Sequence, residues 1–205
     1  MYGVKIAITG KMRSGKDLIA EYLVRKYGFR RFAFGDGVRA VTHLIYPDIQ
    51  NSGTKPRSLY QQIGQALRQI DPAVWLNYTL KEINASTNPF DSIVISDLRQ
   101  PNEYKALLNN GFTIVRVQST VENRLARMNA VGDVFTMDDI NHETESHIDN
   151  FVVDFDITND DGVDQLYKRI ESMLSSMSEG GTRIGNLQDR LLRKTKKDRR
   201  NVSAR

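Results

Sequence analysis

The 205-residue sequence contains no cysteine, and it has only three histidines and five prolines. Without cysteine there is neither a disulfide framework nor a thiolate metal site, and three histidines make a zinc site a poor hypothesis. No apolar run approaches the 18 residues of a membrane-spanning helix, and the first residues lack the basic and apolar regions of a signal peptide. We therefore expect a soluble, cytoplasmic protein without a membrane partner.

Basic charge is concentrated at the end of the chain. Residues 179–205 carry nine Lys and Arg against three Asp and Glu, whereas residues 1–178 carry 20 against 22. Such a run is usually a solvated extension, and sometimes an arm for RNA or an acidic partner. We predict one domain over residues 1–178 and a flexible basic tail over 179–205, with nucleic acid bound only through that tail.

The chain does contain a phosphate-binding loop. An apolar strand leads into Gly10-x4-Gly15-Lys16, and an amphipathic segment follows. The glycines let the backbone turn so that N–H groups face phosphate oxygens, and Lys16 brings an ammonium group to the β- and γ-phosphates. Asp17 stands where the usual motif has a Ser or Thr hydroxyl for Mg²⁺. The residues assigned to the nucleotide are Gly10, Lys11, Met12, Arg13, Ser14, Gly15, Lys16, Asp17 and Asn159.

Strands alternate with helices along the chain, which predicts an α/β fold with a parallel sheet. The pattern predicts strands at Val4–Thr9, Arg31–Phe34, Ser92–Ser96, Phe112–Gln118 and Asp154–Thr158. It predicts helices near Val38–Ile45, at Arg57–Ile70, from an Asp71 N-cap and Pro72 to Ile83, from Pro101 to Gly111, from a Ser119–Glu122 capping box, and along the apolar stripe from Val163 to Met177.

The block Ser96-Asp97-Leu98-Arg99-Gln100-Pro101-Asn102-Glu103 lies at the carboxyl end of a predicted buried strand, where open α/β sheets bind ligands. An acid such as Asp97 can hold Mg²⁺ directly or through water, as a Walker B Asp does. Arg99 can form a bidentate fork to a phosphate. The alternative is an Asp at a helix start beside a surface Arg.

Further charged side chains form candidate groups on the predicted helices. Asp36, Arg39 and Arg68, with Arg57, would bind the phosphate of an acceptor, although each Arg alone could be a solvated surface charge. Arg124 and Arg127 are spaced i,i+3 on one helix face and would close over the transferring phosphoryl group; the alternative is a basic surface stripe.

His142 and His147 flank a segment that superficially resembles a zinc helix. The histidines are roughly 140° apart around a helix, whereas the metalloprotease motif needs i,i+4 spacing. We interpret this segment as core or hinge.

With these residues identified, the chain resembles a family of small P-loop kinases. It is similar to bacteriophage-type deoxynucleoside monophosphate kinases and animal-type phosphomevalonate kinases at residues 10–17, at Ser96-Asp97-x-Arg99, and at 145–156. The likeness covers residues 4–175. The Phe34-Gly-Asp36 segment and the spacing of Gln62, Gly64, Arg68, Asp71 and Trp75 look more like the nucleotide kinases.

The resemblance implies a P-loop NTPase fold of the nucleoside-monophosphate-kinase type: a five-stranded parallel sheet flanked by helices, an acceptor-binding region near 36–85 and a short lid near 120–148. It also implies ATP with Mg²⁺ as the phosphoryl donor, and a (deoxy)nucleoside 5′-monophosphate as the preferred acceptor. The resulting assignments are Lys16, Asp97, Arg99, Arg124 and Arg127 for catalysis, Asp36, Arg39, Arg68, Trp75 and Arg99 for the acceptor, and Asp17 and Asp97 for the metal.

Other readings remain open from the sequence. A kinase of a non-nucleotide phosphate, such as phosphomevalonate or dephospho-coenzyme A, would share the donor site. A nucleotide-gated nucleic-acid-binding protein would use the basic tail as its arm, and the net acidity of residues 1–178 counts against it. The acceptor's base and sugar and the oligomeric state, including a homodimer, are also left open.

Overall fold

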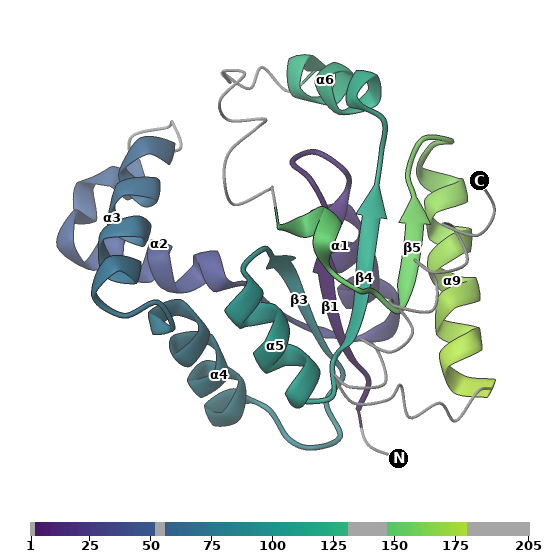
Figure 1. Cartoon of the computed structure of the whole chain (residues 1–205), viewed down its shortest axis with the longest axis horizontal. Helices are drawn as coiled ribbons and strands as arrows, with labels where there is room; N and C mark the ends of the chain where they lie inside the picture. The colour runs from purple at the N-terminus through teal and green to yellow at the C-terminus, as the bar shows by residue number, and fades with distance from the viewer. Residues whose placement is uncertain (1–2, 52–55, 131–146, 180–205) are drawn as a thin grey trace, which may run out of the picture.

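The central element of the fold is a five-stranded sheet with the order β2-β3-β1-β4-β5 (Figure 1). The computed structural model describes residues 3–51, 56–130 and 147–179. All four strand pairs are parallel, so the predicted fold class is confirmed. The strands are β1 (Lys5–Thr9), β2 (Arg30–Phe32), β3 (Ile93–Leu98), β4 (Thr113–Gln118) and β5 (Phe155–Thr158).

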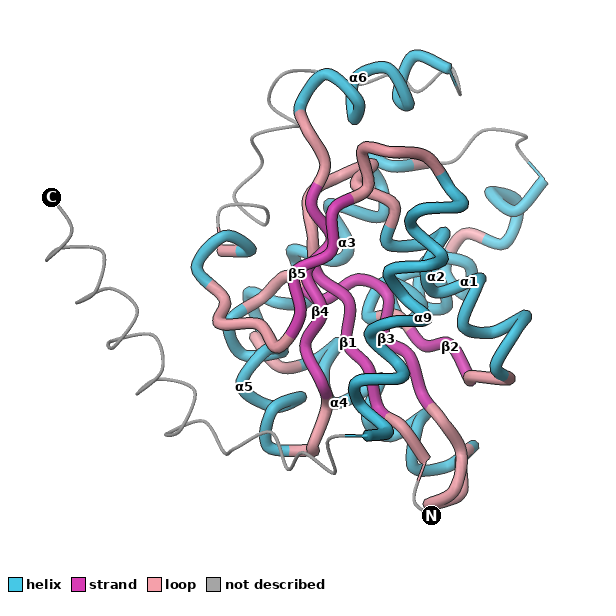
Figure 2. The backbone as a smooth tube through the Cα atoms, turned by 90° about the vertical axis from the view of Figure 1, so that its right-hand side faces the viewer, coloured by secondary structure: helices cyan, strands magenta, loops and turns pink. Residues whose placement is uncertain are grey.

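Helices cover both faces of the sheet, as the edge-on view of Figure 2 shows. Alternation along β1 sends Ile6 and Ile8 into the cluster shared with α1 and α9, and Ala7 into the cluster shared with α2, α4 and α5. The helices are α1 (Lys16–Tyr27), α2 (Phe34–Ile45), α3 (Arg57–Ile70), α4 (Val74–Ser86), α5 (Pro101–Asn109), α6 (Val121–Ala130) and α9 (Val163–Glu179), with short 3-10 turns η1 (Pro47–Asn51) and η2 (Ile148–Asn150).

Parallel pairing places the carboxyl ends of the strands at one edge of the sheet. Thr9 of β1 pairs with Leu98 of β3 and with Arg116 of β4, and Gln118 pairs with Thr158 of β5. The segments that follow these strands therefore meet at this edge, which is where open α/β sheets bind ligands.

Helix α2 begins at Phe34, four residues earlier than the sequence predicts, and strand β2 ends at Phe32 rather than at Phe34. The cause is a distant cap. The N–H groups of Phe34 and Gly35 donate to the two carboxylate oxygens of Asp97, at 2.8 and 2.9 Å. These bonds satisfy N–H groups that the first helical turn leaves without partners.

Two predicted helix starts are wrong in detail. Helix α4 begins at Val74 rather than at Pro72, because Asp71 forms a turn in which its side chain accepts the N–H of Ala73 at 2.8 Å. Helix α6 is capped by Thr120, whose hydroxyl accepts the N–H of Asn123 at 3.3 Å. Ser119 is not the cap, because its hydroxyl donates to Asp160 at 2.7 Å.

Several expectations fall outside the described residues. They include most of the predicted lid, the first histidine of the rejected zinc segment, and all of the basic tail except Glu179. Among the helices of the described ranges, none combines the length and apolarity needed to cross a membrane.

Candidate functional site

The loop from Gly10 to Lys16 joins β1 to α1 and packs closely against its neighbours. Gly10 has φ 147° and Gly15 has φ 108°, both in the region that favours glycine. A Cβ atom on Gly10 would lie 2.4 Å from the Val117 carbonyl oxygen, and one on Gly15 would lie 2.2 Å from Nδ2 of Asn159. Both glycines are therefore required by conformation and by space.

Lys16 begins α1 inside this loop and is 7% exposed. Its ammonium group donates to the carbonyl oxygens of Gly10 at 2.6 Å and Lys11 at 2.8 Å. The side chain thus folds over the loop that the sequence assigns to phosphate. The first turn of α1 adds the positive end of the helix dipole at the same place.

Three consecutive carbonyl groups of the loop are held by side chains from other elements. Arg124 Nη1 lies 3.5 Å from the Met12 carbonyl oxygen, and Arg127 Nη1 donates to that of Arg13 at 3.2 Å. Asn159 Nδ2 donates to that of Ser14 at 2.8 Å. Because the C=O and N–H of a trans peptide point in opposite directions, the contacts at Met12 and Ser14 turn the N–H groups of Arg13 and Gly15 away from Arg124 and Asn159. The peptide that Arg127 holds carries the N–H of Ser14, which donates to the Lys11 carbonyl oxygen at 3.1 Å.

We call residues 10–16 together with Ser119, Arg124, Arg127, Asn159 and Asp160 the phosphate-loop cluster. The sequence predicts all of its members except Ser119 and Asp160. The two arginines share one face of α6, as their i,i+3 spacing predicts, and Arg124 is 4% exposed. Contact of either arginine with a phosphoryl group stays a prediction.

A second group of charged side chains lies at the carboxyl end of β3, and Asp97 is its centre. Burial raises the pKa of Asp97, although the N–H groups of Gly35 and Phe34 oppose the shift. The charge of Arg99 lowers this pKa and that of Asp36 raises it, so both side chains lie near the carboxylate. A Cβ atom on Gly35 would lie 3.4 Å from Arg39 Nη1, which places Arg39 there too.

Glu103 and Arg68 complete this group; Glu103 lies in the block predicted after the strand, but the sequence assigned it no role of its own. Its carboxylate, 3% exposed, accepts the N–H groups of Arg99 at 3.1 Å and Gln100 at 2.9 Å. Burial raises the pKa of Glu103 to about 7, the Asp97 charge adds to the rise, and Arg68 opposes it. We call Asp36, Arg39, Arg68, Asp97, Arg99 and Glu103 the β3 cluster.

The carboxylate of Asp36 bridges two arginines. It forms an ion pair with Arg39 one turn along α2 and lies 3.8 Å from Arg31 at the end of β2. Arg31 also lies 4.0 Å from Asp17, whose side chain is 79% exposed. Arg31 therefore joins the start of α1 to the start of α2, a connection that its position within a strand did not suggest.

Trp75 of α4, assigned to the acceptor, lies in the core in this structure. It is 2% exposed, and its indole N–H donates to the Gly64 carbonyl oxygen at 3.0 Å. The ring also lies against Gly37, where a Cβ atom would be 3.0 Å from it. Trp75 thus joins α2, α3 and α4, and any contact with an acceptor stays a prediction.

The phosphate-loop cluster has the features that a bound triphosphate requires. It offers a lysine ammonium group, a helix N-terminus and inward N–H groups. The Ser14 hydroxyl is buried and has no hydrogen-bond partner within the described ranges. The described residues contain no group of three potential metal-ligating side chains. Of the two carboxylates assigned to Mg²⁺, Asp97 accepts N–H groups of α2 on both oxygens and Asp17 is 79% exposed. Carboxylate oxygens are suitable Mg²⁺ ligands, and the metal assignment stays a prediction.

Comparison with known proteins establishes the fold of this chain but not its family. No family model matches the chain. A protein of Ictalurid herpesvirus 1 (strain Auburn), described as uncharacterized protein ORF77, is 27% identical over 118 residues. That match spans 57% of this chain and 51% of the viral protein, so the chain covers about half the length of the curated relative.

Solved structures with the same fold include TT1252 from Thermus thermophilus and proteins whose titles describe them as kinases. TT1252 from Thermus thermophilus has a TM-score of 0.55 and 15% identity over 86% of this chain and 99% of that one. Shikimate kinase from Acinetobacter baumannii, in complex with shikimate, has a TM-score of 0.54 and 14% identity over 85% and 94%. A sugar kinase from Janibacter sp. HTCC2649 has a TM-score of 0.50 and 14% identity over 84% and 95%. At these identities the likeness establishes the fold.

Proposed function

We propose that this protein is an ATP-dependent kinase that transfers the γ-phosphoryl group to a small phosphorylated acceptor, with a (deoxy)nucleoside 5′-monophosphate as the preferred acceptor class. The observation that carries the proposal is the phosphate-loop cluster, in which side chains from α6 and from the end of β5 hold three successive loop carbonyls. The shikimate and sugar kinase titles among structures of the same fold support the reaction class.

The β3 cluster supports a phosphorylated acceptor. It brings three arginines, Arg39, Arg68 and Arg99, to the edge of the sheet next to the phosphate loop, together with the carboxylates of Asp36 and Asp97. A phosphate monoester between such arginines would form charge-assisted hydrogen bonds. Its negative charge would also be offset as it approaches the donor's γ-phosphate.

Catalysis by this arrangement consists mainly of positioning and charge neutralisation, because phosphoryl transfer requires little covalent chemistry from the protein. Lys16 and the loop N–H groups would bind the donor phosphates, and Arg39, Arg68 and Arg99 would orient the acceptor. Asp17 and Asp97 would hold Mg²⁺, which when bound would neutralise charge between the β- and γ-phosphates. Arg124 and Arg127 would close from α6.

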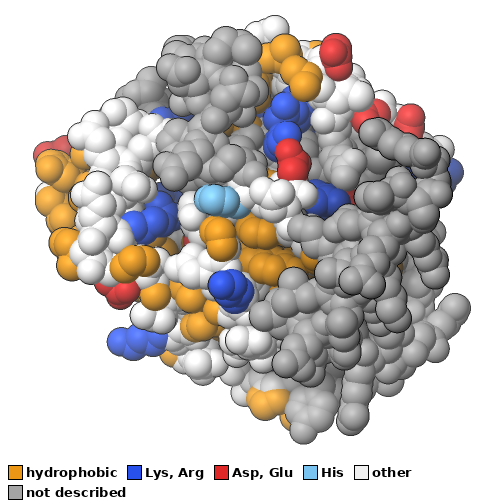
Figure 3. Space-filling view, viewed as in Figure 1, with side chains coloured by type: hydrophobic (Ala, Val, Ile, Leu, Met, Phe, Trp, Pro, Cys, Tyr) orange, Lys and Arg blue, Asp and Glu red, His pale blue; other side chains and the backbone are white. Residues whose placement is uncertain are grey.

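Nucleic-acid binding by the folded domain has less support. On the face drawn in Figure 3, the Lys and Arg side chains of the described residues are separated by uncharged and hydrophobic side chains. A nucleic-acid interface usually gathers basic residues into a continuous patch or stripe.

The experiment that tests the proposal is ADP release by the full-length chain with ATP and Mg²⁺ across a panel of acceptors. The panel contains the common nucleoside and deoxynucleoside monophosphates, phosphomevalonate, dephospho-coenzyme A, and shikimate as an acceptor without phosphate. We expect turnover with at least one nucleoside monophosphate. Turnover with phosphomevalonate or dephospho-coenzyme A alone would replace the acceptor class, and turnover with shikimate alone would contradict a phosphorylated acceptor.

A further inference from the structure

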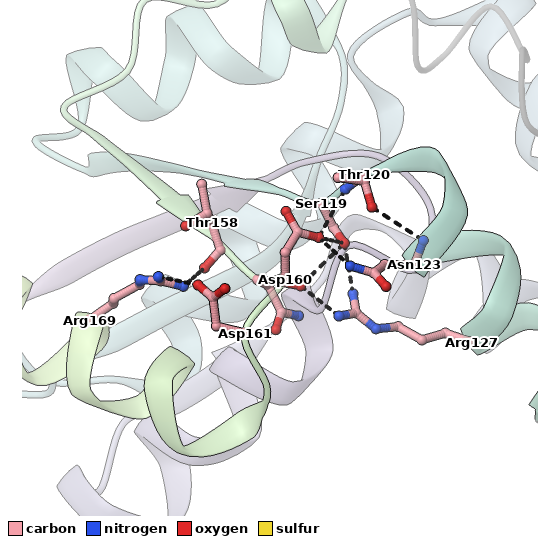
Figure 4. Close-up of polar contacts among 9 residues, drawn as sticks. Ser119, Thr120, Asn123, Arg127, Thr158, Asp160, Asp161 and Arg169 are labelled. Atoms are coloured by element: carbon pink, nitrogen blue, oxygen red, sulfur yellow. Dashed lines mark hydrogen bonds and ion pairs between the residues drawn. The ribbon is translucent and has the colours of Figure 1, made fainter.

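The loop after β5 carries an aspartate that binds the beginning of α6. Oδ1 of Asp160 accepts hydrogen bonds from Ser119 Oγ at 2.7 Å, from the Thr120 N–H at 3.0 Å and from Asn123 Nδ2 at 2.9 Å (Figure 4). These partners lie 37 to 41 residues away in the sequence. One carboxylate oxygen therefore joins two loops at the carboxyl edge of the sheet.

Asp160 is suited to hold a helix start. Its negative charge lies beside the first turn of α6, where the helix dipole favours an anion. Hydrogen bonds from the Asn123 and Ser119 side chains lower its pKa to about 2. The carboxylate is therefore ionised throughout the pH range in which a kinase is assayed, and its contacts with α6 do not vary with pH in that range.

Helix α6 then carries Arg127 to the phosphate loop. Arg127 lies one turn beyond Asn123, on the same face of the helix. Its Nη2 donates to the Asn159 carbonyl oxygen at 2.6 Å, and its Nη1 donates to Ser119 Oγ at 3.1 Å and to the Arg13 carbonyl oxygen at 3.2 Å. Asp160, α6 and Arg127 thus form a continuous set of contacts that ends on the loop.

The Arg13 carbonyl lies at the conformationally demanding point of the loop. Arg13 has φ 59°, and it is the only residue other than glycine with a positive φ in the described ranges. Such a conformation is unfavourable for a side chain with a Cβ atom and persists when surrounding contacts hold it. The bond from Arg127 is one of those contacts.

We infer that Asp160 is a positioning residue for the phosphate loop. It fixes the start of α6, keeps Arg127 on the Arg13 carbonyl, and so maintains the positive-φ conformation of Arg13 on which the shape of the phosphate loop depends. The inference rests on the proposed nucleotide site and extends it to an acid outside the phosphate-binding motif. Loss of Asp160 is expected to weaken the donor nucleotide rather than the acceptor.

The adjacent aspartate provides a matched control. Asp161 lies in the same exposed loop, but its carboxylate pairs with Arg169 of α9 and not with α6 (Figure 4). Asp160→Ala and Asp161→Ala each remove one negative charge from neighbouring positions; the first removes three hydrogen bonds to the start of α6, and the second removes an ion pair with Arg169. They differ in the element that is released, so a general effect of loop charge or loop stability would appear in both.

The first experiment measures ATP and acceptor affinity of both variants by isothermal titration, well below their melting temperatures. Asp160→Ala should raise the dissociation constant of ATP about tenfold. Asp161→Ala should stay within about twofold of the wild type, and acceptor affinity should be unchanged in both. Asp160→Asn keeps an acceptor oxygen and should fall between wild type and Asp160→Ala. Equal ATP affinity in Asp160→Ala and Asp161→Ala would overturn the inference.

A double-mutant cycle tests whether Asp160 acts through Arg127. If it does, Asp160→Ala combined with Arg127→Ala should weaken ATP no more than Arg127→Ala alone. Fully additive losses would show that Asp160 does not work through this arginine and would overturn the inference.

Hydrogen exchange separates this inference from the proposed function. In the ligand-free chain, amides of residues 11–15 should exchange faster in Asp160→Ala than in Asp161→Ala or the wild type. A wild type that fails to bind ATP would defeat the proposed function, and the exchange rates would still decide the role of Asp160. Unchanged exchange in residues 11–15 of Asp160→Ala would count against that role.

Discussion

The phosphate-loop cluster and the β3 cluster lie at the same edge of the sheet, but different groups hold them together. In the phosphate-loop cluster, charged and amide side chains donate to backbone carbonyls, as Arg127 does at Arg13 and Asn159 does at Ser14. In the β3 cluster, carboxylates accept backbone N–H groups, as Asp97 does from Phe34 and Gly35, and the charges of the neighbouring side chains shift their pKa values. The first arrangement fixes a backbone shape, whereas the second sets a local balance of charge.

Their carboxylates illustrate the contrast. Asp160 receives three hydrogen bonds at an exposed site, and its pKa falls to about 2. Glu103 is buried near Asp97, and its pKa rises to about 7. Under the proposed function, the phosphate-loop cluster would bind the phosphates that every nucleoside triphosphate shares. Under the proposed function, the β3 cluster would contact the acceptor, and the raised pKa of its buried Glu103 makes its charge sensitive to its surroundings.

The largest expected effect is at Lys16. Lys16→Ala removes the ammonium group that the proposed function assigns to the donor phosphates, and loss of such a charge should lower kcat about 10²- to 10³-fold or more. ADP release measures the loss, and circular dichroism checks the fold. Arg25→Ala, at the exposed end of the same helix, is the control. Near-wild-type turnover in Lys16→Ala would mean that this loop does not bind the reacting phosphates.

The sequence predicted the features whose residues lie close together along the chain. Glycines and a lysine at fixed spacing predicted the phosphate loop, and apolar runs predicted all five strands to within about two residues. It did not predict the contacts between segments that are far apart in the sequence. The cap that starts α2 at Phe34 comes from Asp97, 63 residues away, and Asp160 finds Ser119 at a separation of 41 residues. Single acids or hydroxyls at such positions carry no local pattern.

The acceptor side was predicted only in outline for the same reason. Arg68 lies on α3 and Arg99 directly follows β3. Only the folded chain brings them near Glu103 and Asp97. The sequence gives no role to Glu103, because its burial and the nearby charge of Asp97 arise only in the folded chain. The sequence can thus indicate a cluster of charged side chains, but it does not show which arginine lies near which carboxylate.

The second prediction separates the two clusters by ligand. Arg68→Ala and Arg99→Ala should each lower kcat/KM for the acceptor about 10- to 100-fold, because one charge-assisted contact contributes roughly 1.5–3 kcal/mol. ATP affinity should stay within about twofold of the wild type. Steady-state kinetics with each substrate varied in turn measures both effects. Lys105→Ala, exposed on α5, is the control. Equal losses for ATP and acceptor would show that the two clusters do not bind the two ligands separately.

The third prediction concerns Asp17, which lies between the clusters. If its carboxylate meets Mg²⁺ directly or through water, Asp17→Asn should lower kcat about tenfold and be partly rescued by high Mg²⁺ or Mn²⁺. If it serves only the helix dipole and the 4.0 Å contact with Arg31, stability should change by about 0.3–1 kcal/mol and metal dependence should not. Mg²⁺ titrations of turnover distinguish the two, with Glu21→Gln, exposed on the next turn of α1, as the control.

The smallest expected effect is a pH dependence of stability at Glu103, and it tests the charge balance of the β3 cluster directly. Its pKa in the folded chain, about 7, lies above the ordinary value of 4.5. Between these two values the folded state binds more protons than the unfolded state. The stabilisation due to Glu103 is therefore fully present below about pH 4.5 and is lost as the pH rises toward 7. The loss should amount to roughly 1–3 kcal/mol.

Glu103→Gln keeps an oxygen that can accept the N–H groups of Arg99 and Gln100, but it cannot ionise. Relative to the wild type, it should therefore gain stability between pH 5 and pH 8, as urea unfolding at several pH values would measure. Glu82→Gln, an exposed change on α4, should follow the wild-type curve. If the Glu103→Gln and wild-type curves run parallel, Glu103 does not ionise in this range, and the contrast with Asp160 loses its electrostatic basis.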